Sequence, residues 1–104
     1  MAITSNPTVQ NGAVSTGTGT HSFLNITATT AVKSTSGRVV AVNVIVAGSA
    51  AGAVFDHPTT SGIANSNCVA VVPEAIGTYF FNFPCSTGIT VVPPTGATIS
   101  VSFN

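Results

Sequence analysis

Residues Arg38 to Asp56 decide the fold, and they read Arg-Val-Val-Ala-Val-Asn-Val-Ile-Val-Ala-Gly-Ser-Ala-Ala-Gly-Ala-Val-Phe-Asp. Residues 39–46 form the most apolar run of the chain. Their β-branched side chains favour a pleated strand over a helix. Small residues at 48–52 then separate this run from a second short apolar run at 53–55. The pattern predicts two strands joined as a central β-hairpin.

Both faces of the predicted strand 39–46 are largely apolar. Because strand side chains alternate between faces, we expect one face to carry Val40, Val42, Val44 and Val46. The opposite face is then made of Val39, Ala41, Asn43 and Ile45. An antiparallel sheet usually leaves one face in water. A strand that is apolar on both faces therefore predicts two covers, its own core on one face and a neighbouring subunit on the other. We predict the second face as a subunit or capsid interface.

The composition narrows the classes of partner. The chain has 104 residues, which suits one domain with a single core. Only 4% of its residues are charged and its formal net charge is zero, against about 25% charged residues in average soluble proteins. Two basic residues argue against binding to nucleic acid and to anionic membranes, which both require Lys and Arg. Neutral proteins tend to associate, so we expect a homo-oligomer.

The start of the chain and its cysteines indicate a compartment. Met1-Ala2-Ile3 has neither a basic segment nor a long apolar segment after it, so we expect no signal peptide and no transmembrane segment. The predicted compartment is a cytoplasm, unless the protein leaves it inside a particle. Cys68 and Cys85 are then expected to be free and buried, with a disulfide between them as the less favoured alternative.

Residues 1–20 differ in composition from the rest of the chain. They are rich in Thr, Ser, Gly and Asn, and residues 16–20 read Thr-Gly-Thr-Gly-Thr. We predict a flexible N-terminal arm over 1–20 and one β-sandwich domain over 21–104. The arm is either a simple tail or a segment that orders on a partner. In the second case we predict Val9 and Val14 as residues of its subunit or capsid interface, and they give the arm little apolar surface to anchor with.

The remaining strands are short and are separated by polar turns. Alternating patterns predict strand regions at 22–32, 68–72, 78–83, 89–92 and 97–103, and no run has helical periodicity. Seven or so short strands at regular spacing indicate a single-domain antiparallel β-sandwich, jelly-roll-like in our prediction. The pattern alone leaves an immunoglobulin-like sandwich open as the alternative. Asn104 directly follows the last strand, so we expect the C-terminal end of the chain to be tied into the sheet.

The aromatic centre of the chain is the run 78–83, Thr-Tyr-Phe-Phe-Asn-Phe. Alternation places Tyr79, Phe81 and Phe83 on one face, with Phe80 and Asn82 on the other. Three alternating aromatics more often fill the core of a sandwich than a ligand groove. We therefore predict a core role for Tyr79, Phe81 and Phe83 and keep the groove as the alternative.

Groups for catalysis are scarce. The chain has two acids, two histidines and two cysteines, and it contains no Gly-x-Ser-x-Gly, His-Glu-x-x-His or Cys-x-x-Cys motif. We predict no enzyme activity, no catalytic residue, no metal and no cofactor. Asp56 and His57 are a candidate metal site only if symmetry gathers several copies, and a solvated loop is the favoured interpretation. Lys33 and Arg38, the two basic residues, are expected to discourage misassembly at strand ends rather than to bind a partner.

Three stretches carry a resemblance to a known class of proteins. They are residues 37–50 and 52–56, together with Phe80-Phe81-Asn82-Phe83-Pro84-Cys85-Ser86-Thr87-Gly88-Ile89-Thr90-Val91. From about Ala31 to its end the chain resembles small virion proteins of tailed bacteriophages, in particular their head decoration or cement proteins. The resemblance implies a trimer of jelly-roll or sandwich subunits bound to the major capsid protein on the outside of the head.

From the resemblance we expect a structural virion protein, made in the host cytoplasm and located on the capsid surface. The alternative is a receptor- or glycan-binding module of a phage tail or head fibre, because jelly rolls also bind sugars. A bacterial adhesin or pilus-like subunit is a third interpretation, disfavoured by the expected lack of a secretion signal.

Overall fold

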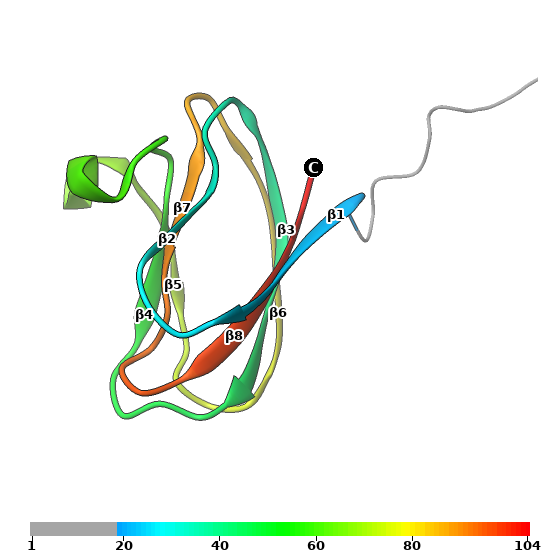
Figure 1. The fold of residues 1–104 in the computed structure, drawn as a ribbon, viewed down its shortest axis with the longest axis vertical. Helices are drawn as coiled ribbons and strands as arrows, with labels where there is room; N and C mark the ends of the chain where they lie inside the picture. The colour runs from blue at the N-terminus through cyan, green and yellow to red at the C-terminus, as the bar shows by residue number, and fades with distance from the viewer. Residues whose placement is uncertain (1–18) are drawn as a thin grey trace, which may run out of the picture.

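The computed structural model describes residues 19–104, which form two four-stranded antiparallel sheets packed face to face (Figure 1). The first sheet has the order β1-β8-β3-β6 and the second has the order β2-β7-β4-β5. The strands are β1 (His21–Ile26), β2 (Thr30–Lys33), β3 (Gly37–Val46), β4 (Gly52–Phe55), β5 (Cys68–Val72), β6 (Gly77–Cys85), β7 (Ile89–Val92) and β8 (Thr98–Phe103). The predicted antiparallel β-sandwich is therefore confirmed for the described residues.

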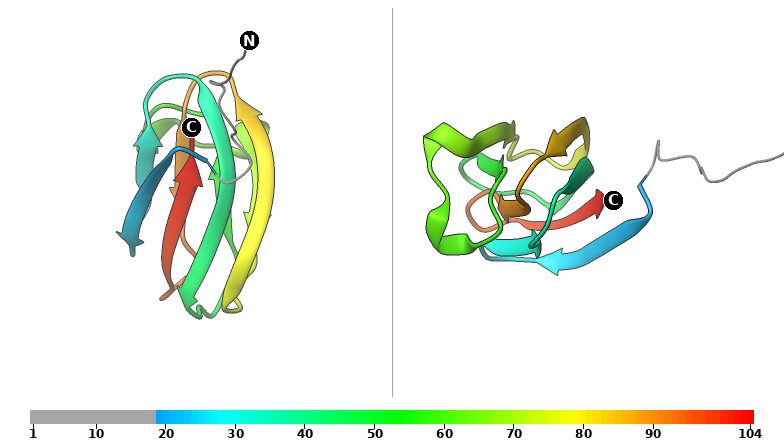
Figure 2. Two further views of the ribbon diagram at one scale, coloured as in Figure 1. Left: turned by 90° about the vertical axis from the view of Figure 1, so that its right-hand side faces the viewer. Right: turned by 90° about the horizontal axis from the view of Figure 1, so that it is seen from above.

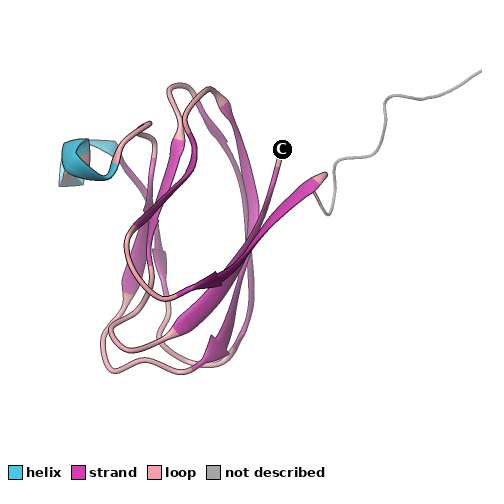
Figure 3. Ribbon diagram, viewed as in Figure 1, coloured by secondary structure: helices cyan, strands magenta, loops and turns pink. Residues whose placement is uncertain are grey.

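Helical structure within residues 19–104 consists of two short 3-10 turns between β4 and β5 (Figure 3). They are η1 (Thr60–Gly62) and η2 (Asn65–Asn67). In this part of the chain no helix has the length and apolar character needed to cross a membrane.

The strands pair in a nested order. β1 pairs with β8, β2 with β7, β3 with β6, and β4 with β5, all antiparallel. Strands that follow each other along the chain lie in different sheets, except β4 and β5, which lie in the same sheet. The chain is thus a long hairpin whose two arms fold together from sheet to sheet. Figure 2 (left) shows the first sheet face on, with β1, β8, β3 and β6 side by side.

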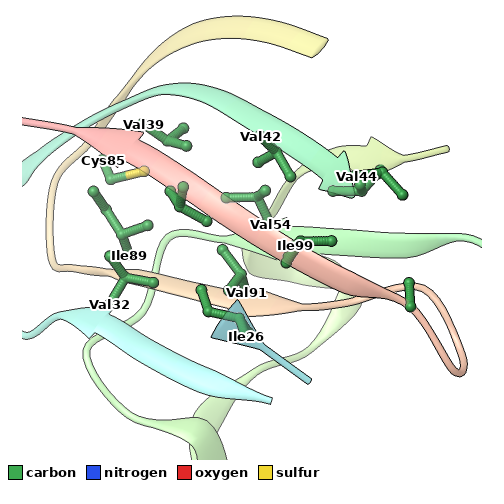
Figure 4. Close-up of a cluster of buried hydrophobic side chains, with 13 residues drawn as sticks. Ile26, Val32, Val39, Val42, Val44, Val54, Cys85, Ile89, Val91 and Ile99 are labelled. Atoms are coloured by element: carbon green, nitrogen blue, oxygen red, sulfur yellow. The ribbon is translucent and has the colours of Figure 1, made fainter. Parts of the chain in front are cut away.

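One apolar core lies between the sheets (Figure 4). Both sheets contribute fully buried β-branched residues, for example Val42 and Ile99 from the first sheet and Val54, Ile89 and Val91 from the second. Burying such a side chain stabilises the fold by about 1.5–3 kcal/mol. The short apolar runs that predict strands in the sequence therefore also supply the core.

The predicted central hairpin is wrong. β3 and β4 lie in different sheets, and β3 pairs with β6 and β8 instead. The segment of small residues at 47–51 crosses between the sheets, held by the bonds Gly48 N–H to Glu74 O (2.9 Å) and Ser49 N–H to Thr95 O (2.9 Å). A short turn of two residues is the strongest sequence signal of a β-hairpin. The connection between β3 and β4 is longer and does not contain such a turn.

The single strand region predicted at 22–32 is also divided. β1 ends at Ile26 and β2 begins at Thr30 in the other sheet. The alternation of residues 22–32 continues through the crossing, so the pattern does not reveal the break. The predictions at 68–72, 78–83, 89–92 and 97–103 are confirmed as β5, β6, β7 and β8, with bounds that differ by at most two residues.

Two asparagines interrupt the edges of the first sheet. Asn25 in β1 and Asn82 in β6 have positive φ angles of 57° and 54°. The register shifts beside both of them, between Phe23 and Ile26 in β1 and opposite Val39–Ala41 in β6. Asn tolerates the left-handed region better than most residues. These bulges bend the two edge strands, a device by which natural sheets limit edge-to-edge pairing.

The two ends of the described chain lie side by side on the first sheet (Figure 1). Thr20 N–H donates to Phe103 O (3.1 Å), and Asn104 N–H donates to Arg38 O (2.9 Å). The Lys33 ammonium donates to the main-chain oxygen of Asn104 (3.0 Å). The expected tie of the C-terminal end to the sheet is thus confirmed. Lys33 contributes to it, a role that the sequence did not indicate.

The predicted arm over residues 1–20 falls mostly outside the described residues. Residues 1–18, with Val9 and Val14 among them, belong to that part. Gly19 lies against Ser102 and Phe103 of β8, and Thr20 bonds to the same strand. Residues 19 and 20, which the prediction assigned to the arm, therefore contact β8 of the sandwich.

Candidate functional site

The outer face of the first sheet carries the residues predicted as an interface. Residues directly opposite each other in antiparallel strands share a face. Ala41 of β3 lies opposite Phe80 of β6 and Ser102 of β8, while Asn43 lies opposite Thr78 and Ser100. Val42 and Val44 alternate with them and are buried in the core. This outer face is therefore a surface of small uncharged side chains with larger apolar ones beside them.

The structure brings three of the four predicted β3 residues to this face. Asn43 and Ile45 are exposed, and Ala41 points outward but is covered by its neighbours. Val39 is different, because it has no exposed surface and packs in the core. The register of β3 against β8 shifts between Val39 and Ala41, which interrupts the strict alternation on which the prediction rested. Val39 is therefore a core residue in this fold.

Three exposed apolar side chains line the β6 edge of this face. We name Ile45, Ile76 and Phe80 the β6 stripe. Their exposed fractions are 56%, 67% and 70%, respectively. Val44 pairs with Gly77, so the residues next to this pair, Ile45 and Ile76, lie at the same end of the two strands. Phe80 lies further along β6, and Thr78 between Gly77 and Phe80 is hydrogen-bonded to Asn43.

The predicted core role of the β6 aromatics holds for two of the three. Tyr79 and Phe81 pack against the core, and the Tyr79 hydroxyl donates to Ala75 O (2.7 Å). Phe83 is 45% exposed although it pairs with the buried Val39, and it lies beyond the bulge at Asn82 in an edge strand. For the alternative prediction of a ligand groove, residues 19–104 contain no pocket.

The first sheet is almost free of charge. Among the strands β1, β8, β3 and β6, one residue is formally charged, Arg38, near the beginning of β3. Ile45 lies near the other end of the same strand. The β6 stripe and the small polar side chains beside it are therefore uncharged, and the charged residue next to them along the chain is the exposed Glu74, two residues before Ile76.

Asp56 occupies a contrasting position at the end of β4. Its carboxylate Oδ1 accepts bonds from Thr87 N–H (2.8 Å), Thr87 Oγ1 (2.9 Å) and Gly88 N–H (3.4 Å). Its Oδ2 accepts a bond from Ser86 N–H (2.9 Å). One carboxylate thus satisfies three successive main-chain donors of the turn between β6 and β7. We name this arrangement the Asp56 clamp.

The clamp changes the titration of two side chains. Burial raises the pKa of the Asp56 carboxyl, but the bonds from Ser86, Thr87 and Gly88 outweigh burial and hold the pKa below its ordinary value. The pKa of the nearby Cys85 thiol rises to about 11, first through burial and then through the negative charge of Asp56. Cys85 is therefore a neutral thiol at physiological pH.

Asp56 and His57, the candidate metal pair, form hydrogen bonds to neighbouring residues of the protein itself. Asp56 is engaged by the 86–88 turn. His57 Nδ1 lies 3.1 Å from both the main-chain N and O of Thr59, and its own carbonyl accepts a bond from the buried Thr90 hydroxyl (2.7 Å). Residues 19–104 hold no group of three or more His, Cys, Asp or Glu side chains placed for a metal ion. The favoured prediction of a simple solvated loop missed this hydrogen bonding.

The two cysteines have different surroundings. Both are free, but Cys68 is exposed at the beginning of β5, while Cys85 is buried at the end of β6. The prediction of free cysteines is confirmed, and the prediction that both are buried is wrong for Cys68. Its strand is the outer edge of the second sheet.

Sequence reasoning missed two members of the exposed surface. Ile76 lies between the predicted strands 68–72 and 78–83, in a segment predicted as a turn. Alternation places Phe80 on the face opposite Tyr79, Phe81 and Phe83 but gives no sign that this face is exposed. The pairing of residues 76–80 with residues 41–45 places the side chains of Ile76 and Phe80 on the outer face. Alternation within one strand does not reveal with which strand it pairs, so the sequence gives no signal for this surface. Comparisons of the chain with protein-family models, curated proteins and solved structures gave no match.

Proposed function

We propose that this protein is a structural subunit of a phage virion, a decoration or cement protein that binds the major capsid protein on the outside of the head and stabilises it. The proposal includes self-association, as a trimer in the form that the resemblance implies. The observation that carries it is the nested pairing of strands in a chain with almost no charge.

The nested pairing supports a jelly roll as the finer description of the sandwich. In a jelly roll, eight strands form two sheets from a long hairpin that is folded over on itself, and viral capsid proteins are among its main users. The pairs β1–β8, β2–β7, β3–β6 and β4–β5 follow this order, with β4 and β5 at the tip of the hairpin.

The low charge supports a role in a repetitive assembly. Burying an ion at an interface is costly unless it is paired, and the neutral first sheet avoids that cost. A capsid offers the same binding site many times, so a bound oligomer gains avidity from several weak contacts. In this proposal residues 1–18 extend the contact onto neighbouring capsid subunits.

The deciding experiment is the copy number of this chain in purified particles of the phage whose genome encodes it. Quantitative mass spectrometry measures the ratio of this chain to the major capsid protein. We expect a ratio near one, or a simple fraction of one, as a head lattice requires. A few copies per particle would replace the proposal by the tail or fibre alternative, and absence from the particle would overturn both.

A second experiment tests binding and the arm together. Heads that lack this chain are mixed with the full chain, and the temperature at which the heads open is measured. We expect the full chain to raise it. A chain without residues 1–18 is expected to bind heads more weakly while its circular dichroism is unchanged, and equal binding would remove the role of the arm.

A further inference from the structure

We propose that the β6 stripe and the adjoining edge of β6 are the surface through which further copies of this chain associate. The inference rests on the self-association in the proposed function, but not on capsid binding. It replaces the predicted interface at Val39, Ala41, Asn43 and Ile45 by a surface centred on Phe80, Ile76 and Ile45.

The exposed apolar area is the first observation. Phe80, Ile76 and Ile45 are each more than half exposed, and all belong to the β3–β6 pair or to the residue directly before β6. Scattered exposed apolar residues are ordinary on a protein surface, but neighbouring ones mark interaction sites. Between them lie Ala41, Asn43 and Thr78, whose short side chains leave the sheet flat enough for another sheet to pack on it.

The state of the β6 edge is the second observation. β6 has nine residues and is the longest of the four edge strands in the described sheets, since β1, β2 and β5 have six, four and five. Natural edges are usually protected by charge, proline or a bulge. In β6, Asn82 and Pro84 protect the second half, while Gly77–Phe81 has none of these devices. The unprotected half is the half that carries Phe80 and follows Ile76.

Charge identifies the occupant. The strands of the first sheet offer a partner one charged residue, Arg38, and it lies away from the Ile45 end of β3. A partner rich in charge therefore finds one charged group near the stripe, the exposed Glu74 two residues before Ile76, and most of its own ions would be buried unpaired. A second copy brings a surface that carries equally little charge. In a symmetric interface each surface meets its own kind, and the uncharged side chains of the stripe meet their copies with little repulsion.

The experiment measures self-association of the full chain by sedimentation velocity over a wide range of concentrations. The test variants are Phe80→Lys and Ile76→Lys, and the matched control is Val71→Lys. Val71 is 62% exposed on β5, the edge strand of the other sheet. All three variants make the same change in charge at similar exposure. We expect each test variant to weaken association by at least about 30-fold, as loss of a central interface residue does.

The control is expected to change the dissociation constant by less than about twofold, because Val71 lies outside the stripe. Circular dichroism of all variants verifies the fold. The inference is overturned if the wild-type chain stays monomeric, if both test variants assemble like wild type, or if the control weakens association as much as they do. Binding of the same variants to heads is measured separately. If the test variants lose self-association and the wild-type chain does not bind heads, this inference stands and the proposed function is overturned.

Discussion

The two sheets of the sandwich share one core but differ on their outer sides. The first sheet has long strands, a neutral outer face and exposed apolar residues along β6. The second has strands of four or five residues, and the Asp56 clamp fastens one of them to the turn between the sheets. The difference indicates a division of roles, in which the second sheet secures the fold and the first presents the surface for association.

The largest expected effect tests whether the sheets depend equally on the core. Ile99 of β8 and Ile89 of β7 both have no exposed surface and belong to opposite sheets. We expect Ile99→Ala and Ile89→Ala each to lower the free energy of unfolding by about 2–5 kcal/mol, from lost burial and the cavity left behind. Urea denaturation measures the change.

The exposed Val71→Ala, outside the β6 stripe, is the control and is expected to change stability by less than about 0.5 kcal/mol. A loss confined to one of the two buried isoleucines would contradict a shared core. It would mean that one sheet remains folded without the packing of the other.

The next effect concerns the clamp of the second sheet. Asp56→Asn keeps the shape of the side chain but loses the charge that attracts three main-chain donors. We expect a loss of about 1–2 kcal/mol, reduced from the full value of charged hydrogen bonds because the site is partly exposed to solvent. Glu74→Gln, the same change at the other acid of the chain, is the control, since Glu74 is exposed. Equal losses in both variants would show that net charge matters and the clamp does not.

The clamp also predicts a pH dependence. The pKa of Asp56 is lower in the folded chain than its ordinary value of 3.8. The stabilisation is therefore complete above that ordinary value and is lost as the pH falls from there through the lower folded pKa. We expect the difference in melting temperature between wild type and Asp56→Asn to be constant from neutral pH to about pH 5 and to shrink below pH 4. A difference that shrinks already near neutral pH would contradict this assignment.

The comparison of the two sheets also shows how much of the fold the sequence predicts. Local patterns predict most strands of both sheets, because β-branched and aromatic runs between polar turns reflect burial directly. The same local patterns do not reveal which distant strands pair. The sequence therefore predicts β3 and β4 as a hairpin and gives no sign that Phe80 lies on the surface. Bulges matter most at the candidate site. The register shift between Val39 and Ala41 places Val39 in the core instead of on the outer face, and a period of two contains no sign of an inserted residue.

A smaller effect tests the bulge that shapes the β6 edge. Asn82 has a φ of 54°, a conformation that costs a residue with a β-carbon about 1 kcal/mol and costs glycine little. We expect Asn82→Ala to lose about 1 kcal/mol and Asn82→Gly to stay within about 0.5 kcal/mol of wild type. Urea midpoints compare the two variants. Equal stability of both would show that residue 82 does not hold a left-handed conformation in solution.

The smallest effect on stability is the most direct probe of the outer sides of the two sheets. Cys68 lies exposed on β5, whereas Cys85 is buried at the end of β6 with a thiol pKa of about 11. Because the thiolate is the reactive form, we expect iodoacetamide at neutral pH to modify Cys68 alone in the folded chain, and both cysteines in denaturant. Peptide mass spectrometry assigns the modified residue. The raised pKa also means that Cys85 stabilises the fold as a neutral thiol up to its unfolded pKa near 9.0, and that this contribution is lost as the pH rises toward 11. Modification of Cys85 at neutral pH without denaturant would contradict this assignment, because it would show that the end of β6 away from the β6 stripe opens in the folded chain.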